Sequence, residues 1–144
     1  MSGRITYSLN HLVTAINAYA DGVLTERWGI TTSQFTFLAV LEDGQPLDIT
    51  RMAECLGVSK AAVSKRVPGL EAKGYVRTVA DPANARRVLL TLTDEGLRLA
   101  HEAGGLLDAE FTQMFADRSD LDLERTHADV LLMLDAVLSK GTPS

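Results

Sequence analysis

The chain has 144 residues, a net charge of −5 and one cysteine. Cys55 alone cannot form an internal disulfide, and His11, His101 and His127 lack metal-ligand spacing, so we expect no metal, no cofactor and no disulfide framework. The sequence shows neither an apolar signal core nor an apolar run near the roughly 18 residues of a membrane span. We therefore expect a cytoplasmic protein with no membrane partner, and its length suits one compact domain with an attached helical module.

Charge is unevenly distributed along the chain. Residues 51–87 hold eight basic and three acidic side chains, a local charge of +5, whereas the remainder carries −10. The net charge alone argues weakly against a nucleic-acid partner. A basic middle flanked by acidic ends is nevertheless what a phosphate-facing surface on an acidic protein would produce.

Two helices are predicted in the first third of the chain. Residues 5–24 carry an apolar side chain at every third or fourth position, which indicates a long amphipathic helix. Thr31, followed three residues later by Gln34, is a capping box, and it predicts a second helix over residues 32–43.

A pair of short capped helices follows. Asp48 is expected to cap a helix that ends at Gly57, and Ser59 a second helix that ends at Gly74. Two capped helices joined by a turn with a glycine form a helix-turn-helix. Pro68 lies inside the second helix, where it removes a backbone hydrogen bond, so we expect a kink or a tightened last turn.

A β-hairpin is predicted after these helices. Residues 75–79 are rich in aromatic and β-branched side chains, residues 81–84 carry turn signals, and residues 87–92 alternate in polarity. The alternation predicts that three side chains point inward: Val88, Leu90 and Leu92.

The C-terminal part is predicted to be helical. Thr93 caps a helix that extends to about residue 116, with a weak point at Gly104 and Gly105. A last helix begins near residues 119–122, and its segment 130–134 is apolar on nearly every side. We expect a partner subunit, in preference to an internal core, to cover that segment. The predicted homodimer interface comprises Leu9, Leu12, Leu131, Leu134 and Leu138.

The second helix of the helix-turn-helix and the hairpin share the basic stretch of the chain. Serine hydroxyls and helix N-terminal amides suit phosphate oxygens, lysine and arginine read guanine edges, and small alanines allow contact with thymine methyls. This arrangement predicts binding to double-stranded DNA through Ser59, Lys60, Ala61, Ser64, Lys65, Arg66, Arg86 and Arg87.

Four segments together resemble the MarR family of winged helix-turn-helix transcription regulators. They are residues 31–35, 52–59, 70–76 and 92–96, in the family's order and spacing, and the resemblance extends over roughly residues 5–138. It implies a repressor, not an enzyme, that binds a pseudo-palindromic operator as a homodimer. It also implies modulation by a small aromatic or phenolic effector, to which we assign no residues.

The expected fold class is mainly α with a small β-hairpin wing. A winged helix-turn-helix region spans residues 31–92, and residues 5–28 and 93–138 form a helical dimerisation region from the N- and C-terminal helices. Residues 139–144 are expected to be a flexible tail.

The wing departs from the family pattern. Where the family carries Asp-x-Arg, this chain reads Asn84-Ala85-Arg86, so an amide replaces the carboxylate anchor and we expect Arg86 to be held more loosely. Arg86 is placed at the wing tip and Arg87 on the outward face of its strand. In the strand that leads into the wing, the family usually carries Val-x-Arg, whereas this chain reads Val76-Arg77-Thr78. Arg77 therefore stands one residue earlier than the family's arginine, on the other face of its strand.

Two other functions remain open. A winged helix that binds protein rather than DNA would have no need of the basic residues on the predicted DNA-binding surface. A redox sensor would use Cys55, but the sequence places no cysteine or histidine beside it, and an inert side chain is the preferred interpretation. His11, Tyr19 and Trp28 lie near where ligands bind in the family, although core or capping roles are preferred.

Overall fold

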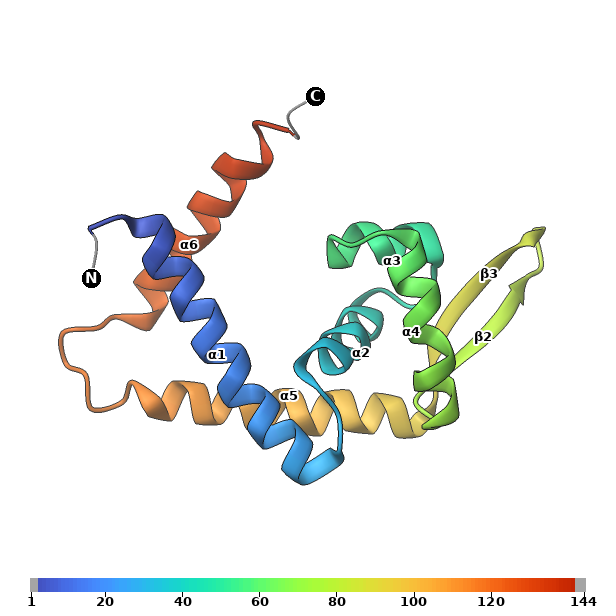
Figure 1. The fold of residues 1–144 in the computed structure, drawn as a ribbon, viewed down its shortest axis with the longest axis horizontal. Helices are drawn as coiled ribbons and strands as arrows, with labels where there is room; N and C mark the ends of the chain where they lie inside the picture. Colours follow the sequence, from blue (N-terminus) through green and yellow to red (C-terminus); the bar gives the residue numbers. More distant parts are fainter. Residues whose placement is uncertain (1–2, 142–144) are drawn as a thin grey trace. The chain divides into compact units, whose positions relative to one another are not determined.

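The computed structural model describes residues 3–141, and it is mainly helical, as predicted. Its helices are α1 (Ile5–Trp28), α2 (Thr32–Gly44), α3 (Ile49–Leu56), α4 (Lys60–Ala72), α5 (Asp94–Met114) and α6 (Leu123–Leu138) (Figure 1). Its strands are β1 (Leu47–Asp48), β2 (Val76–Asp81) and β3 (Asn84–Leu92). The chain divides into two compact units, one up to Leu107 and one from Asp108. Within residues 3–141, no helix is both long and apolar enough to cross a membrane.

The predicted helix starts are confirmed by their side-chain caps. Thr31 Oγ1 accepts a hydrogen bond from the Gln34 amide (3.1 Å), while Gln34 Oε1 accepts one from the Thr31 amide (3.0 Å). Ser59 Oγ accepts from the Ala62 amide at the start of α4 (3.1 Å). These bonds satisfy amides that have no partner within their own helix, which is why each helix begins where it does.

Of the two outcomes expected at Pro68, the tightened last turn is observed, whereas no interruption occurs at the weak point expected at Gly104 and Gly105. Helix α4 runs from Lys60 to Ala72 through Pro68, and only its end is tightened, where the Gly74 amide donates to the Glu71 carbonyl (2.9 Å). Helix α5 likewise continues through Gly104 and Gly105. Both helices bury an apolar face in the core, and this burial outweighs one lost hydrogen bond or a weak helix former.

The wing belongs to a three-stranded antiparallel sheet of order β1-β3-β2, whereas the sequence predicted two strands. The third strand is β1, which pairs Leu47 with Leu90 and Asp48 with Leu89. The hairpin also reaches further than predicted, because β2 and β3 extend to the two-residue turn at 82–83.

One inward-facing prediction in the wing was wrong. Leu90 is fully buried, but Val88 is 43% exposed. Val88 pairs only with Ala80, beyond the segment that β1 covers, so no core lies beneath it. Alternation along a strand therefore fixes the face of a side chain but not its burial.

The structure describes only the first part of the tail that was predicted over residues 139–144. Ser139 is the C-cap of α6, and residues 142–144 lie outside the described residues.

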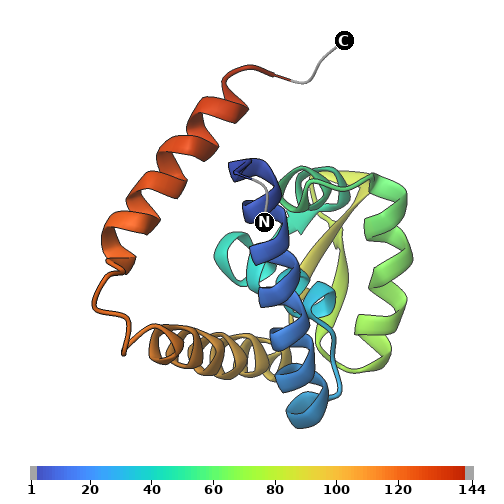
Figure 2. The same cartoon turned by 60° about the vertical axis from the view of Figure 1, so that its left-hand side comes forward.

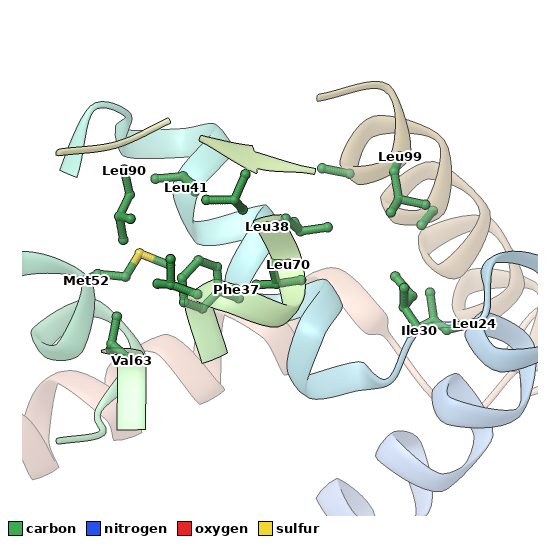
Figure 3. Close-up of a cluster of buried hydrophobic side chains, with 14 of the residues drawn as sticks. Leu24, Ile30, Phe37, Leu38, Leu41, Met52, Val63, Leu70, Leu90 and Leu99 are labelled. Atoms are coloured by element: carbon green, nitrogen blue, oxygen red, sulfur yellow. The ribbon is translucent and has the colours of Figure 1, made fainter. Parts of the chain in front are cut away.

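The hydrophobic core joins the helix-turn-helix to the sheet. Phe37, Leu38 and Leu41 of α2 are fully buried at its centre (Figure 3). Around them pack buried side chains from six other elements, including Leu24, Met52, Val63, Leu90 and Leu99. The helix-turn-helix and the sheet therefore share one core, which fixes α4 relative to the base of the wing.

Hydrogen bonds also join α1 to the start of α2 and to the end of α4. Asp21 accepts a hydrogen bond from the Thr32 amide at the start of α2, and this bond lowers the pKa of Asp21 below its ordinary value of 3.8. Lys73 Nζ, at the end of α4, donates to the Gly29 carbonyl at the C-terminal cap of α1 (2.8 Å).

The end of α4, the start of β2 and the start of α5 meet at a backbone junction. The Thr93 hydroxyl donates to the Gly74 carbonyl (2.6 Å) and accepts from the Gly96 amide (3.0 Å). The Thr93 amide donates to the Tyr75 carbonyl (3.1 Å), and Gly96 packs directly against that same carbonyl.

Replacing Gly96 with alanine is therefore expected to destabilise the protein. A Cβ at this position would overlap the Tyr75 carbonyl oxygen and lie 2.9 Å from its carbon, and rigid backbone cannot move aside cheaply. We expect a loss of about 1–3 kcal/mol or more in unfolding free energy, measured by urea denaturation.

Gly105→Ala is the matched control, because a Cβ there meets nothing within 4 Å in the middle of the same helix. It should stabilise the protein by about 0.5–1 kcal/mol. Equal effects of the two substitutions would contradict this account of the junction.

Candidate nucleic-acid interface

Helix α4 presents an exposed face that carries most of the residues predicted to bind DNA. Val63, Val67 and Leu70 bury its opposite face in the core. The exposed face comprises Ser59, Lys60, Ala61, Ser64 and Lys65. Arg66 is half-buried and lies at the flank of this face, where a long side chain can extend its guanidinium outward past an apolar stem.

Free positive charge is concentrated on this surface. Among residues 3–141, no ion pair involves Lys60, Lys65, Arg66 or Arg86. The first-turn amides of α4 add the partial positive charge of a helix N-terminus. Ser59 caps that turn through its oxygen, and its hydroxyl proton can still be donated to an anion.

The wing carries its arginines on a bulge of β3. The ladder passes from the Ala80–Val88 pair directly to the Asp81–Asn84 pair, so residues 85–87 oppose no residue on β2. Asn84 Oδ1 accepts a hydrogen bond from the Arg86 amide (3.1 Å), which orders the backbone at the start of the bulge. Arg86 itself is exposed. In Figure 1 the tip of the hairpin lies beyond α4, and Figure 2 shows the same elements turned by 60°, with α4 at the right-hand edge.

Arg87 differs from Arg86 because two carboxylates surround it. Its Nε lies 2.7 Å from Asp48 Oδ2, and its Nη1 lies 3.6 Å from Asp81 Oδ2. The side chains of Asp48 and Asp81 are only 17% and 12% exposed. The three side chains together carry a charge of −1, so Arg87 adds no net positive charge to this surface.

The contacts of Asp48 stabilise its ionised form. Its Oδ1 accepts the Arg51 amide at the start of α3 (2.7 Å). This hydrogen bond, with a smaller contribution from the Arg87 guanidinium, lowers the pKa of Asp48 below its ordinary value of 3.8. Sequence reasoning identified Asp48 as a cap but missed it as a partner of Arg87, because 39 residues separate the two.

The remaining candidates lie elsewhere. Cys55 is exposed on α3, and no group of three potential metal ligands occurs within the described part of the chain. His11 and Tyr19 are exposed on α1, whereas Trp28 is half-buried and lines a shallow surface pocket with Tyr75.

The residues predicted to form a dimer interface are largely uncovered. Leu9 of α1 is half-buried and Leu12 is 49% exposed. On α6, Leu131, Leu134 and Leu138 are 52%, 50% and 69% exposed, and that helix buries no residue.

In comparisons with known proteins, this chain is similar to helix-turn-helix transcription regulators. A family model described as the MarR family matches residues 28–87. The uncharacterized HTH-type transcriptional regulator YvnA of Bacillus subtilis is 30% identical over 111 residues, which cover 73% of this chain and 68% of that protein. The HTH-type transcriptional regulator MgrA of Staphylococcus aureus is 21% identical over 105 residues, 73% of this chain and 71% of its own.

Solved structures share the fold over nearly the whole chain. The Staphylococcus aureus MepR–DNA complex aligns with a TM-score of 0.80 at 23% identity, covering 94% of this chain and 99% of that one. Streptococcus pneumoniae FabT in complex with DNA aligns with a TM-score of 0.79 at 20% identity, covering 96% and 98%. The transcriptional regulator BldR from Sulfolobus solfataricus gives 0.78 at 21% identity, covering 94% and 93%.

Proposed function

This chain belongs to the MarR family of DNA-binding transcription regulators, which are not enzymes, and we propose that it is a repressor that binds a pseudo-palindromic operator as a homodimer. The exposed face of α4 supports this proposal most strongly, because two lysines, two serines and a small alanine lie there around a capped helix start. Such a face suits the major groove, where lysines read guanine edges and serines bind phosphates.

The DNA-binding surface that we propose combines α4 with the wing. Its residues are Ser59, Lys60, Ala61, Ser64, Lys65, Arg66 and Arg86. The arginine on the exposed bulge suits the minor groove beside the site read by α4, because a narrow groove concentrates negative potential. Two such units would contact half-sites about 34 Å apart.

The homodimer is supported by the apolar surface of α6. Val130 to Leu134, Val137 and Leu138 are between 38% and 70% exposed, a continuous apolar surface over the second half of the helix. Exposed apolar patches of this kind mark interaction sites in soluble proteins. On α1, Ile5, Leu12 and Val13 add further exposed apolar side chains.

Selection of bound fragments from random double-stranded DNA tests the proposed function. We expect an inverted repeat with half-sites about one helical turn apart, and an affinity that falls steeply with salt because basic side chains displace counterions. A panel of small aromatic acids, added to the selected operator, tests modulation by an effector. Recovery of no preferred sequence at low salt would contradict the proposal and favour a protein-binding winged helix.

A further inference from the structure

The ion pairs of Arg87 connect the wing to the helix-turn-helix. Asp48 belongs to β1 and caps α3, and Asp81 ends β2 beside the hairpin turn. Arg87 is on the bulge of β3 and lies between these two carboxylates. Strand β1 pairs only with Leu89 and Leu90 of β3, so the outer half of the hairpin lies beyond that pairing. Through Arg87, this outer half contacts Asp48 of β1.

Each oxygen of the two carboxylates has a partner. Asp48 uses Oδ1 for the Arg51 amide and Oδ2 for Arg87. Asp81 uses Oδ1 for the Ala83 amide in the turn (2.9 Å) and places Oδ2 near Arg87. Each acid therefore accepts a nearby backbone amide and also contacts the same guanidinium, and the planar, multiply donating guanidinium suits this bridging role better than an ammonium group.

We propose that Arg87 does not contact DNA but acts as a positioning residue, which with Asp48 and Asp81 sets the direction of the wing relative to α3 and thereby places Arg86 at the DNA. This inference rests on the proposed DNA-binding function. Arg86 is adjacent to Arg87 on the same bulge, so a wing released from Asp48 would move Arg86 directly.

A double variant separates positioning from direct contact. Asp48→Ser retains an N-cap acceptor for the Arg51 amide, because serine and aspartate cap helices about equally well. Asp81→Asn retains an acceptor for the Ala83 amide in the turn. The pair of substitutions thus removes both partners of Arg87 while preserving both backbone hydrogen bonds.

The two possible roles of Arg87 predict opposite changes in the DNA affinity of this double variant. If Arg87 contacted DNA, loss of two nearby negative charges would strengthen binding. Under the positioning role, binding to the selected operator should weaken by about fivefold to tenfold, with the larger loss on operators with A·T flanks. Arg87→Ala in the double-variant background should then change affinity less than twofold, because its role is already lost. Tighter or unchanged binding, or an undiminished effect of Arg87→Ala, would overturn the inference.

A measurement without DNA keeps this inference separable from the proposed function. Hydrogen exchange of the amides of residues 85–89 should be faster in the double variant than in the wild type, while exchange in α4 stays unchanged. Wild-type protein that selects no operator would contradict the proposed function alone. Unchanged exchange in the wing would contradict the positioning role even if DNA binding were confirmed.

Discussion

Leu134→Asp is expected to convert the protein to a monomer and to abolish operator binding. The side chain lies with Leu131 and Leu138 on one side of α6, and a carboxylate there would have to be buried without a partner in the proposed interface. Two linked recognition units gain affinity from each other, so separating them should cost about 100-fold or more. Sedimentation measures the oligomeric state, and fluorescence anisotropy with labelled operator measures the affinity.

Ala136→Asp is the matched control for this substitution. It introduces the same charge into the same helix, on the side opposite Leu134 and shared with Asp129. We expect this variant to remain dimeric and to bind the operator normally. A dimer with wild-type affinity for Leu134→Asp would remove α6 from the interface, and with it the main support for the homodimer.

Lys65→Ala should weaken operator binding by about 1–3 kcal/mol per half-site if its ammonium group reads a base. Lys65 is exposed on the face of α4 opposite the buried Val63 and Val67, and it forms no ion pair within residues 3–141. Affinities for operators altered at each position show whether the preference is relaxed at one symmetric pair of positions, which base reading requires.

The control for Lys65 removes the same charge elsewhere. Lys140→Ala changes a lysine that follows α6 and should leave operator affinity nearly unchanged at moderate salt. Equal losses on every DNA sequence for Lys65→Ala would instead identify a phosphate contact. Equal losses for the two lysine variants would mean that only net charge matters, and the proposed recognition surface would then be wrong.

Local sequence signals predicted the helix starts because each of them depends on residues a few positions apart. The capping box at Thr31 and the cap at Ser59 are examples, since their acceptors and donors lie within one turn. The exposed face of α4 followed from the same periodicity, because burial of Val63 and Val67 determines which residues face outward. Arg66 shows the limit of that reasoning, as it falls at the flank and is half-buried.

Contacts between distant residues were not predictable in the same way. The pairing of β1 with β3 and the ion pair of Asp48 with Arg87 join segments about 40 residues apart, and neither leaves a periodic signal in the sequence. Alternation placed Arg87 on the outward face of its strand but could not show that two acids occupy that face. Gly104 misleads for a related reason, because the burial that stabilises α5 is also contributed by distant residues.

The junction of Gly74, Tyr75, Thr93 and Gly96 has a mechanical consequence. At this junction, the backbones of α4, β2 and α5 contact one another through the Thr93 hydroxyl and Gly96. No long, flexible side chain therefore separates the three elements. Close-packed contacts of this kind transmit displacement rather than absorb it. A rotation of the first turn of α5 would therefore displace the end of α4 and the start of β2 as well. Under the proposed function, α5 would thereby be coupled to both parts of the DNA-binding surface, although it contributes no residue to that surface.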